Sequence, residues 1–325
     1  MNEQVDEPLK DATAEGTAAG ASLAASDGRR FILVKVNIPF CYHRCDFCTR
    51  DVVAGWDSAR MGRYVDALVR EIGSCAGQFD DCEVGAVHLG GGIASMAGGE
   101  EILRVCEALR SAFSLADGAP ITMRSSCASI SGASMPLFSR AGVTRFDFEV
   151  MSLNAPDFLQ IDFVNPIEKI PFVANSFLHA RTRLNMGMVL LYGKKGIKPL
   201  DFRRSILGFT RGLSCHLIMQ RYEGEDRADE AQVAEQLATV RDLVCGAGFV
   251  EYLPLRFAKP GCEDRFSLER SRGTEVMAFG MGAKSSFAGT ETLATMDLDL
   301  YCAESAHPER ILKVVARKDG ETRQA

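Results

Sequence analysis

The chain has 325 residues, of which 46% are hydrophobic and 25% are charged, and its formal net charge is −6. This length and composition are typical of a soluble globular protein with a large core. The negative net charge argues against a general nucleic-acid binder, which normally carries a basic face. No stretch reaches the roughly 18 apolar residues of a membrane span.

Cysteine usage and the amino-terminal residues indicate the compartment. The eleven cysteines are odd in number and scattered along a long chain, unlike a secreted disulfide scaffold. We therefore expect a reducing cytoplasm, with thiols free or bound to metal. Residues 1–29 are rich in small and polar residues and lack the charged-then-apolar order of a signal peptide. We predict a disordered leader there.

From residue 31 onward, short apolar runs alternate with amphipathic stretches, which is typical of parallel strands covered by helices. Helices are predicted over residues 61–72, 102–113, 136–140, 157–180, 200–211 and 233–244. Strands are predicted over residues 31–38, 84–89, 121–123, 143–150, 184–191 and 217–221, with a later one over 249–253.

Six strand–helix units predict an α/β fold, an open partial (β/α)6 barrel similar to a TIM barrel rather than a complete eight-fold one. No linker divides the region, so we expect one core domain over residues 30–290 and a helical and polar tail over 291–325. In such sheets the chemistry gathers at the carboxyl ends of the strands.

Three cysteines, Cys41, Cys45 and Cys48, follow the first predicted strand directly. Structural zinc and ordinary iron–sulfur sites take four protein ligands, so three local thiolates leave one metal position open. The spacing Cys-x3-Cys-x2-Cys is similar to that of the radical S-adenosylmethionine enzymes, in which three thiolates hold a [4Fe-4S] cluster. The alternatives are a zinc site with a distant fourth ligand such as His43, and inert core cysteines.

Gly90, Gly91 and Gly92 end the second predicted strand. Because glycine has no side chain, these residues would let the backbone approach a cofactor closely. The alternative is a plain turn. Their place one strand after the cysteine loop favours the cofactor interpretation.

Further segments occur in a specific order. These are NIPFC from residue 37, HLGGGIAS from 88, AGVTR from 141, FVEY from 249, RFAKPG from 256 and FGMGA from 279. Together they resemble the family of oxygen-independent coproporphyrinogen III oxidases and heme chaperones, within the radical S-adenosylmethionine superfamily. The resemblance runs from about residue 32 to residue 287.

The resemblance implies a [4Fe-4S] cluster on Cys41, Cys45 and Cys48, with S-adenosylmethionine on its open iron. Phe47 would lie beside the cluster and the adenine, with core packing as its alternative role. The resemblance also implies an electron donor such as flavodoxin or ferredoxin, and a 5′-deoxyadenosyl radical that abstracts hydrogen from a small-molecule, porphyrin-like substrate.

The chain departs from the family pattern at polar positions. Lys35 and Asn37 replace the tyrosine and histidine of relatives that oxidise coproporphyrinogen. The other departures replace residues at or near the relatives' cofactor contacts, at Arg124, Glu149, Met151, Phe163 and Val189. Each lost hydrogen bond would cost roughly 1–3 kcal/mol, so the pocket would be rebuilt.

Two of these residues would compensate for the losses. Arg124 would pair with the ligand carboxylate, and Glu149 would accept a hydrogen bond from a ribose hydroxyl. The alternative for both is a structural or surface ion pair.

Bona fide coproporphyrinogen oxidation is not expected. The tyrosine and histidine are replaced, and the stretch after residue 287 is short for the helical domain that covers the site in relatives. We expect a radical S-adenosylmethionine enzyme acting on a porphyrin-like or other small molecule. The alternatives are a non-catalytic heme-binding or heme-transfer chaperone, which keeps the cluster, and a radical methyltransferase acting on an aromatic or quinone substrate.

Overall fold

The computed structural model describes residues 28–55, 57–152, 184–197 and 215–317. Most of the predicted leader and the helices predicted over 157–180 and 200–211 lie outside the described residues, and so does Phe163.

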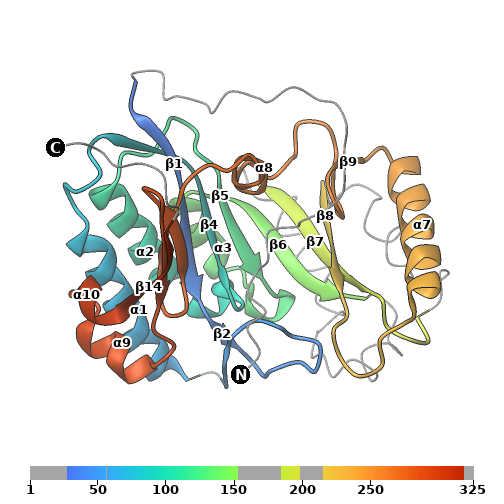
Figure 1. Cartoon of the computed structure of the whole chain (residues 1–325), viewed down its shortest axis with the longest axis horizontal. Coiled ribbons are helices and arrows are strands. Elements are labelled where there is room, and N and C mark those ends of the chain that lie inside the picture. The colour runs from blue at the N-terminus through green and yellow to red at the C-terminus, as the bar shows by residue number, and fades with distance from the viewer. Residues whose placement is uncertain (1–27, 56, 153–183, 198–214, 318–325) are drawn as a thin grey trace.

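A sheet of twelve strands organises the described part of the chain (Figure 1). Seven of its strands are parallel, and six of these lie side by side in sequence order. They confirm the six predicted parallel strands. They are β1 (Arg30–Ile38), β4 (Cys82–Gly91), β5 (Ile121–Ser125), β6 (Val143–Met151), β7 (Asn185–Tyr192) and β8 (His216–Arg221).

Further strands extend both sides of this parallel block. Strand β11 pairs with β1 in parallel, and β12, β13 and β14 follow it antiparallel. On the other side β10 and β9 follow β8. The sheet has two separate ends, so the barrel is open. These strands are β9 (Val250–Leu253), β10 (Arg256–Ala258), β11 (Val276–Phe279), β12 (Lys284–Phe287), β13 (Thr290–Ala294) and β14 (Leu312–Arg317).

The stretch after residue 290, for which a helical and polar tail is expected from sequence, contains both helices and strands. Strands β13 and β14 place residues up to 317 in the main sheet, and two short helices, α9 (Leu298–Glu304) and α10 (Pro308–Ile311), connect them. A local apolar pattern does not reveal these strands, because β13 is short and mostly half-buried and β14 is almost entirely exposed.

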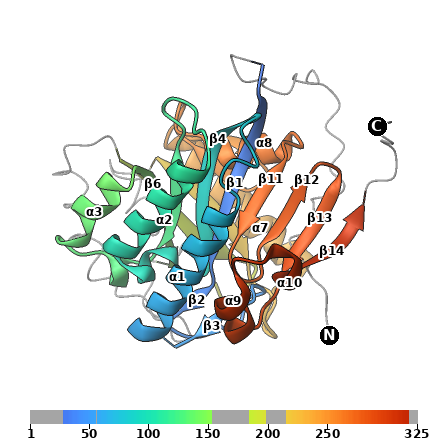
Figure 2. The same cartoon turned by 90° about the vertical axis from the view of Figure 1, so that its left-hand side faces the viewer.

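Helices α1, α2 and α3 cover the outer face of the parallel strands side by side (Figure 2). Helix α1 begins where the Asp57 carboxylate accepts hydrogen bonds from the N–H groups of Ala59 and Arg60. The helices are α1 (Ser58–Ser74), η1 (Ala94–Ala97), α2 (Gly99–Ala112), η2 (Cys127–Ser129), α3 (Ser134–Arg140), α7 (Glu230–Gly246) and α8 (Arg265–Ser271).

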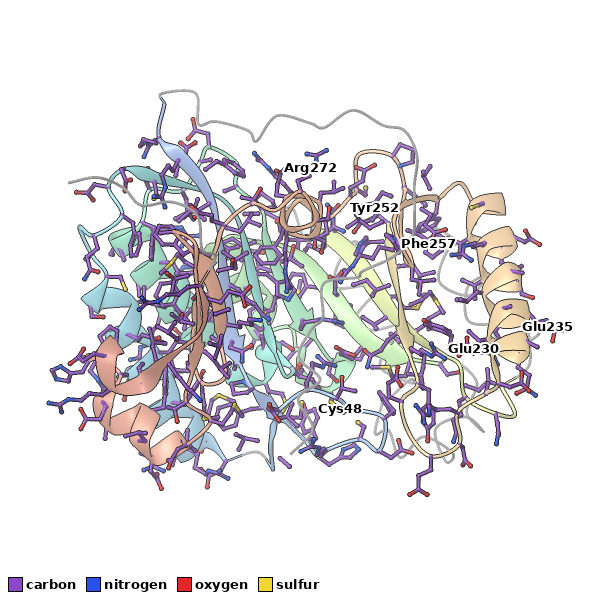
Figure 3. All side chains as sticks on the ribbon, in the orientation of Figure 1. Cys48, Glu230, Glu235, Tyr252, Phe257 and Arg272 are labelled. Carbon is purple, nitrogen blue, oxygen red and sulfur yellow. The ribbon has the colours of Figure 1, made fainter. Side chains whose placement is uncertain are left out.

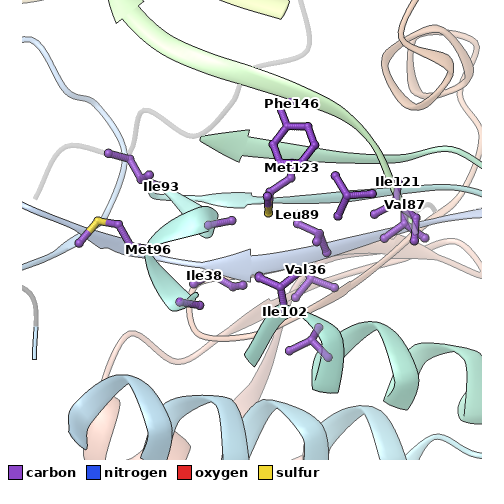
Figure 4. Close-up of a cluster of buried hydrophobic side chains, with 14 of the residues drawn as sticks. Val36, Ile38, Val87, Leu89, Ile93, Met96, Ile102, Ile121, Met123 and Phe146 are labelled. Carbon is purple, nitrogen blue, oxygen red and sulfur yellow. The ribbon is translucent and has the colours of Figure 1, made fainter. Parts of the chain in front are cut away.

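The two faces of the parallel strands have different chemistry. Side chains alternate along a strand, and one set forms the apolar core with the helices, for example Leu89, Met123 and Phe146, which belong to the same cluster as Ile102 of α2 (Figure 4). The other set lines the inside of the barrel and is unusually polar for parallel strands. It includes His88, Thr122, Arg124, Asp147, Glu149 and His216. Buried polar groups need partners, so the inner face is where a site is expected.

One buried carboxyl outside the barrel makes stability depend on pH. Glu71 on α1 accepts hydrogen bonds from the Gly280 N–H and the Tyr301 hydroxyl, and burial raises its pKa to about 7. Because the pKa of Glu71 is higher in the folded than in the unfolded protein, its protonated carboxyl stabilises the fold. This contribution to the free energy of unfolding is complete below pH 4.5 and is lost as pH rises through 7. The loss amounts to roughly 3 kcal/mol.

We therefore expect Glu71→Gln, which keeps an acceptor but cannot ionise, to flatten the pH dependence of unfolding. Urea unfolding at several pH values between 5 and 8 measures this, with Glu304→Gln as the control. If the free energy of unfolding changed with pH equally in the wild type and in Glu71→Gln, the raised pKa of Glu71 would be contradicted.

Candidate metal and cofactor site

The loop with Cys41, Cys45 and Cys48 lies at the carboxyl ends of the parallel strands, where Cys48 is labelled in Figure 3. Its base is held by backbone pairing. The strands β2 (Phe40–Cys41) and β3 (Val53–Ala54) pair with each other, and the Ile93 N–H donates to the Phe40 carbonyl at 2.9 Å. The three cysteines predicted as ligands are therefore brought to one end of the barrel.

All three thiols are half-buried and free. Burial raises the pKa of Cys41 to about 11 and that of Cys45 to about 12, with a further rise from the neighbouring Cys48 sulfur. The Arg50 guanidinium acts in the opposite direction on both. The Cys41 and Cys45 thiols are thus protonated at neutral pH when no metal is bound, and metal binding would release their protons.

The donor set fits a cluster by its chemistry. Thiolates are soft ligands suited to iron–sulfur centres. Within the described ranges, no three His, Cys, Asp or Glu side chains converge as the ligands of a single metal ion. A [4Fe-4S] cluster does not need such convergence, because each thiolate binds a different iron. His43, the alternative ligand, places Nε2 3.6 Å from the Cys45 sulfur.

The three glycines have a packing explanation. A Cβ on Gly92 would stand 2.3 Å from the Phe40 carbonyl oxygen, and one on Gly91 would stand 2.5 Å from the Asn37 Oδ1. A Cβ on Gly90 would stand 2.6 Å from Nε2 of His88. The contact at Gly92 is with backbone, so glycine is needed there, whereas at Gly90 and Gly91 it is with side-chain ends. A contact between these residues and a cofactor stays a prediction.

Gly92→Ala should loosen the junction between β4 and the cysteine loop, since the clash is with backbone. Overpacking of this kind typically costs about 1–3 kcal/mol. Gly62→Ala on α1 is the matched control, because nothing lies within 4 Å of its added Cβ. Urea unfolding should show Gly92→Ala less stable and Gly62→Ala unchanged or more stable; a fully stable Gly92→Ala protein would refute the packing explanation.

Arg124 and Glu149, predicted to contact a ligand or to form an ion pair, lie next to each other. The Arg124 Nη1 is 2.9 Å from the Glu149 Oε1, and the Arg50 Nη2 donates to the same oxygen at 3.2 Å. Burial acts to raise the pKa of Glu149, but the charges of Arg124 and Arg50 bring the pKa below its ordinary value. Glu149 is therefore an ionised carboxylate inside the barrel.

This ion-pair cluster is not fully satisfied. The Glu149 Oε2 is buried and has no hydrogen-bond partner among the described residues. A buried acceptor without a donor is costly, so a ligand hydroxyl or amino group at this oxygen would be favourable. Arg50 was missed in the sequence analysis. The available signal was a basic residue directly after the cysteine motif.

Phe47 and two of the departures from the family pattern form one apolar cluster. Phe47, which is 3% exposed, packs with Met151 and Val189. The cluster, called here the apolar wall, consists of Phe47, Met151, Val189, Leu191, Ile218 and Tyr222, with Cys45 against it. The structure thus shows a packing role for Phe47, and Met151 and Val189 supply its surroundings. A separate departure, Asn37, donates to the Met281 carbonyl at 2.8 Å.

A second polar group lies toward the opposite end of the barrel, where Tyr252 is labelled in Figure 3. The His216 Nδ1 is 3.1 Å from the Asp147 Oδ1, and its Nε2 is 2.6 Å from the Tyr252 hydroxyl. Gly187 makes room for this pair, since a Cβ there would overlap Asp147. This group could not be predicted from sequence, because its members come from three distant segments.

None of the described helices combines the length and apolar character that crossing a bilayer requires.

No family model matches the chain. Heme chaperone HemW of Mycobacterium tuberculosis is 24% identical over 324 residues, covering 88% of this chain and 82% of that protein. An oxygen-independent coproporphyrinogen III oxidase of Mannheimia haemolytica is 31% identical over 100 residues, covering 31% of this chain and 68% of the relative.

A solved structure is similar to this chain over most of its length. Coproporphyrinogen III oxidase (HemN) from Escherichia coli, a radical SAM enzyme, superposes with a TM-score of 0.76 at 19% identity. The match covers 90% of this chain and 72% of that one. It confirms the expected α/β partial barrel.

Proposed function

Because the chain belongs to the radical S-adenosylmethionine superfamily, in the family of oxygen-independent coproporphyrinogen III oxidases and heme chaperones, we propose that it holds a [4Fe-4S] cluster on Cys41, Cys45 and Cys48. The observation that carries the proposal is the position of these three half-buried thiols. They lie on one loop at the carboxyl ends of the strands, beside the buried Glu149 carboxylate.

We further propose that S-adenosylmethionine binds next to this loop. When bound, the cluster would supply the electron for reductive cleavage of the cofactor, and the cofactor would supply the radical chemistry. An external donor of the flavodoxin or ferredoxin type would provide the electron. The substrate would be a porphyrin-like or other small molecule.

The chain's own residues would bind and orient the cofactor. The ionised Glu149 would accept a hydrogen bond from a ligand hydroxyl or amino group at its open oxygen. Arg124 would hold Glu149 in place and offer positive charge to a ligand carboxylate. The backbone of Gly90, Gly91 and Gly92 would border the cofactor, and Phe47 with the apolar wall would exclude water from one side.

Glu149 accounts for two departures from the family pattern at once. The resemblance implies an acidic residue at the end of the third strand, where this chain has Arg124, and a glycine after the fourth strand, where this chain has Glu149. Since the two side chains pair across neighbouring strands, a carboxylate is still present, supplied from β6 instead of β5. This favours a rebuilt cofactor pocket over a lost one.

A heme-binding or heme-transfer role is the second candidate. It is favoured by the apolar wall, where Met151 and Val189 stand in place of polar cofactor contacts, and by the similarity to heme chaperone HemW. A chaperone would keep the cluster and would not need to cleave the cofactor.

One anaerobic experiment separates the two. Cluster-reconstituted protein is reduced with dithionite, and its EPR signal is recorded with and without S-adenosylmethionine, while 5′-deoxyadenosine is assayed. A shifted signal with 5′-deoxyadenosine release is the result expected of the enzyme. A cluster EPR signal that does not change when S-adenosylmethionine is added, together with heme retained on purification, would support the heme-binding or heme-transfer role. A protein without a cluster would overturn both.

A further inference from the structure

A chain of hydrogen bonds from outside the cysteine motif reaches the cysteine loop. The Tyr222 hydroxyl, directly after β8, donates to the Asp46 Oδ2 at 2.9 Å. Lys194, just after β7, donates from Nζ to the Tyr222 oxygen at 3.4 Å. Asp46 lies between Cys45 and Phe47, so the chain ends inside the segment that carries two of the three thiols.

Lys194 and Tyr222 are both 2% exposed, which is unusual for a lysine. The ammonium is stabilised by the Asp226 Oδ2 at 3.3 Å and by the Tyr222 ring, whose centroid is 4.5 Å away. Because Lys194 donates to the Tyr222 oxygen, it polarises the hydroxyl and strengthens the bond that this hydroxyl donates to Asp46.

The same tyrosine also holds the next loop residue. The Phe47 and Tyr222 rings belong to the apolar wall, with centroids 6.1 Å apart. Two consecutive residues, Asp46 and Phe47, are therefore fixed by one side chain, one through a hydrogen bond and the other through packing. Gly224 leaves room for this arrangement, since a Cβ there would stand 2.3 Å from the Tyr222 hydroxyl.

The backbone around Lys194 and Tyr222 is held to the barrel by hydrogen bonds. The Tyr222 N–H donates to the Tyr192 carbonyl at 2.8 Å. The buried Gln236 on α7 accepts from the Gly193 N–H at 2.7 Å and donates to the Lys194 carbonyl at 3.3 Å. Cys41, by contrast, is held by the pairing of β2 with β3.

We propose that Tyr222 and Lys194 are positioning residues for the metal site. They hold the segment from Cys45 to Cys48 against the barrel, so that two of the three thiols are presented before any metal arrives. The third thiol, Cys41, is positioned independently. The role in metal binding rests on the function proposed above, but the ordering of the metal-free loop does not.

Thiol alkylation of the metal-free protein tests the ordering. Rates of iodoacetamide labelling are measured for each cysteine by peptide mass spectrometry in the wild type, Tyr222→Phe, Lys194→Met and Asp46→Asn. Asp51→Asn is the matched control, because Asp51 is also an exposed aspartate near the motif. The exposed Cys245 reports general reactivity.

Cys45 and Cys48 should be labelled about tenfold faster in Tyr222→Phe, the factor that one hydrogen bond of ~1.4 kcal/mol represents. Cys41 should keep its wild-type rate, and Asp51→Asn should behave as wild type. Unchanged rates at Cys45 and Cys48, or an equal increase at Cys41, would overturn the proposal.

Iron loss from the reconstituted protein gives a second readout. Transfer of iron to a chelator under anaerobic conditions should be roughly tenfold faster in Tyr222→Phe and in Asp46→Asn. The double variant should be no faster than either single one, since both remove the same bond. Equal rates in wild type and both variants would refute a role at the metal site. If the wild type never takes up a cluster, the proposed function fails, and the alkylation rates still decide the ordering.

Discussion

Cys45→Ser should abolish cluster assembly, whereas the wild-type protein should take up about four irons and four sulfides per chain. The serine oxygen is a hard and weakly acidic ligand, so it does not replace a soft thiolate on iron. Three thiolates are the whole local ligand set, so the loss of one leaves two open positions. Iron and sulfide analysis after anaerobic reconstitution, with the EPR of the reduced protein, measures the effect.

Cys245→Ser is the control for this experiment. Cys245 is an exposed, free cysteine on α7, far along the chain from the motif, and its replacement should leave iron content unchanged. Cys41→Ser and Cys48→Ser should behave like Cys45→Ser. If any of these three variants kept the full iron content, the assignment of the ligands would be wrong.

Glu149→Gln should destabilise the protein and remove the response of the cluster to S-adenosylmethionine. The substitution leaves Arg124 buried without its carboxylate, and breaking a buried ion pair typically costs 3–5 kcal/mol. We expect about 3 kcal/mol, because the Arg50 side chain is 30% exposed and can reach water. Urea unfolding measures the stability, and the EPR shift on cofactor addition measures binding.

Two further variants separate stability from binding. Glu230→Gln removes a carboxylate that is 80% exposed from its pair with Arg221, and surface pairs contribute about 0–1 kcal/mol. The double variant Arg124→Met with Glu149→Leu removes both buried charges and should regain most of the stability. It should still give no EPR shift with the cofactor. If this double variant gave the wild-type EPR shift, Arg124 and Glu149 would not be part of the cofactor site.

The parallel strands were predictable because their signal is local. Each is an apolar run bounded by turn residues, and the structure extends the predicted ranges by a few residues at most, for example from 84–89 to Cys82–Gly91. The cysteine motif was readable for the same reason, since its ligands lie within eight consecutive residues. Strands β13 and β14 were missed because a short, mostly half-buried strand and an almost entirely exposed one have no clear apolar alternation of their own.

The electrostatics of the site could not be predicted in the same way. From sequence, Arg124 and Glu149 each have two possible roles, because their pairing across β5 and β6 depends on the strand register. Arg50 joins them only because the loop folds back over the barrel. Likewise, Met151 and Val189 looked like isolated losses of polar contacts, whereas packing places them together around Phe47.

The sequence by itself determined the fold class, the end of the barrel that carries the chemistry, and the three thiols proposed as ligands. These depend on residue type and short spacing, which survive without knowledge of the fold. Only the tertiary structure decided which charges meet, which glycines make room for protein atoms, and what holds the cysteine loop. Those contacts join residues as far apart as Asp46 and Tyr222, and long-range proximity is set by strand register and packing, which no local pattern encodes.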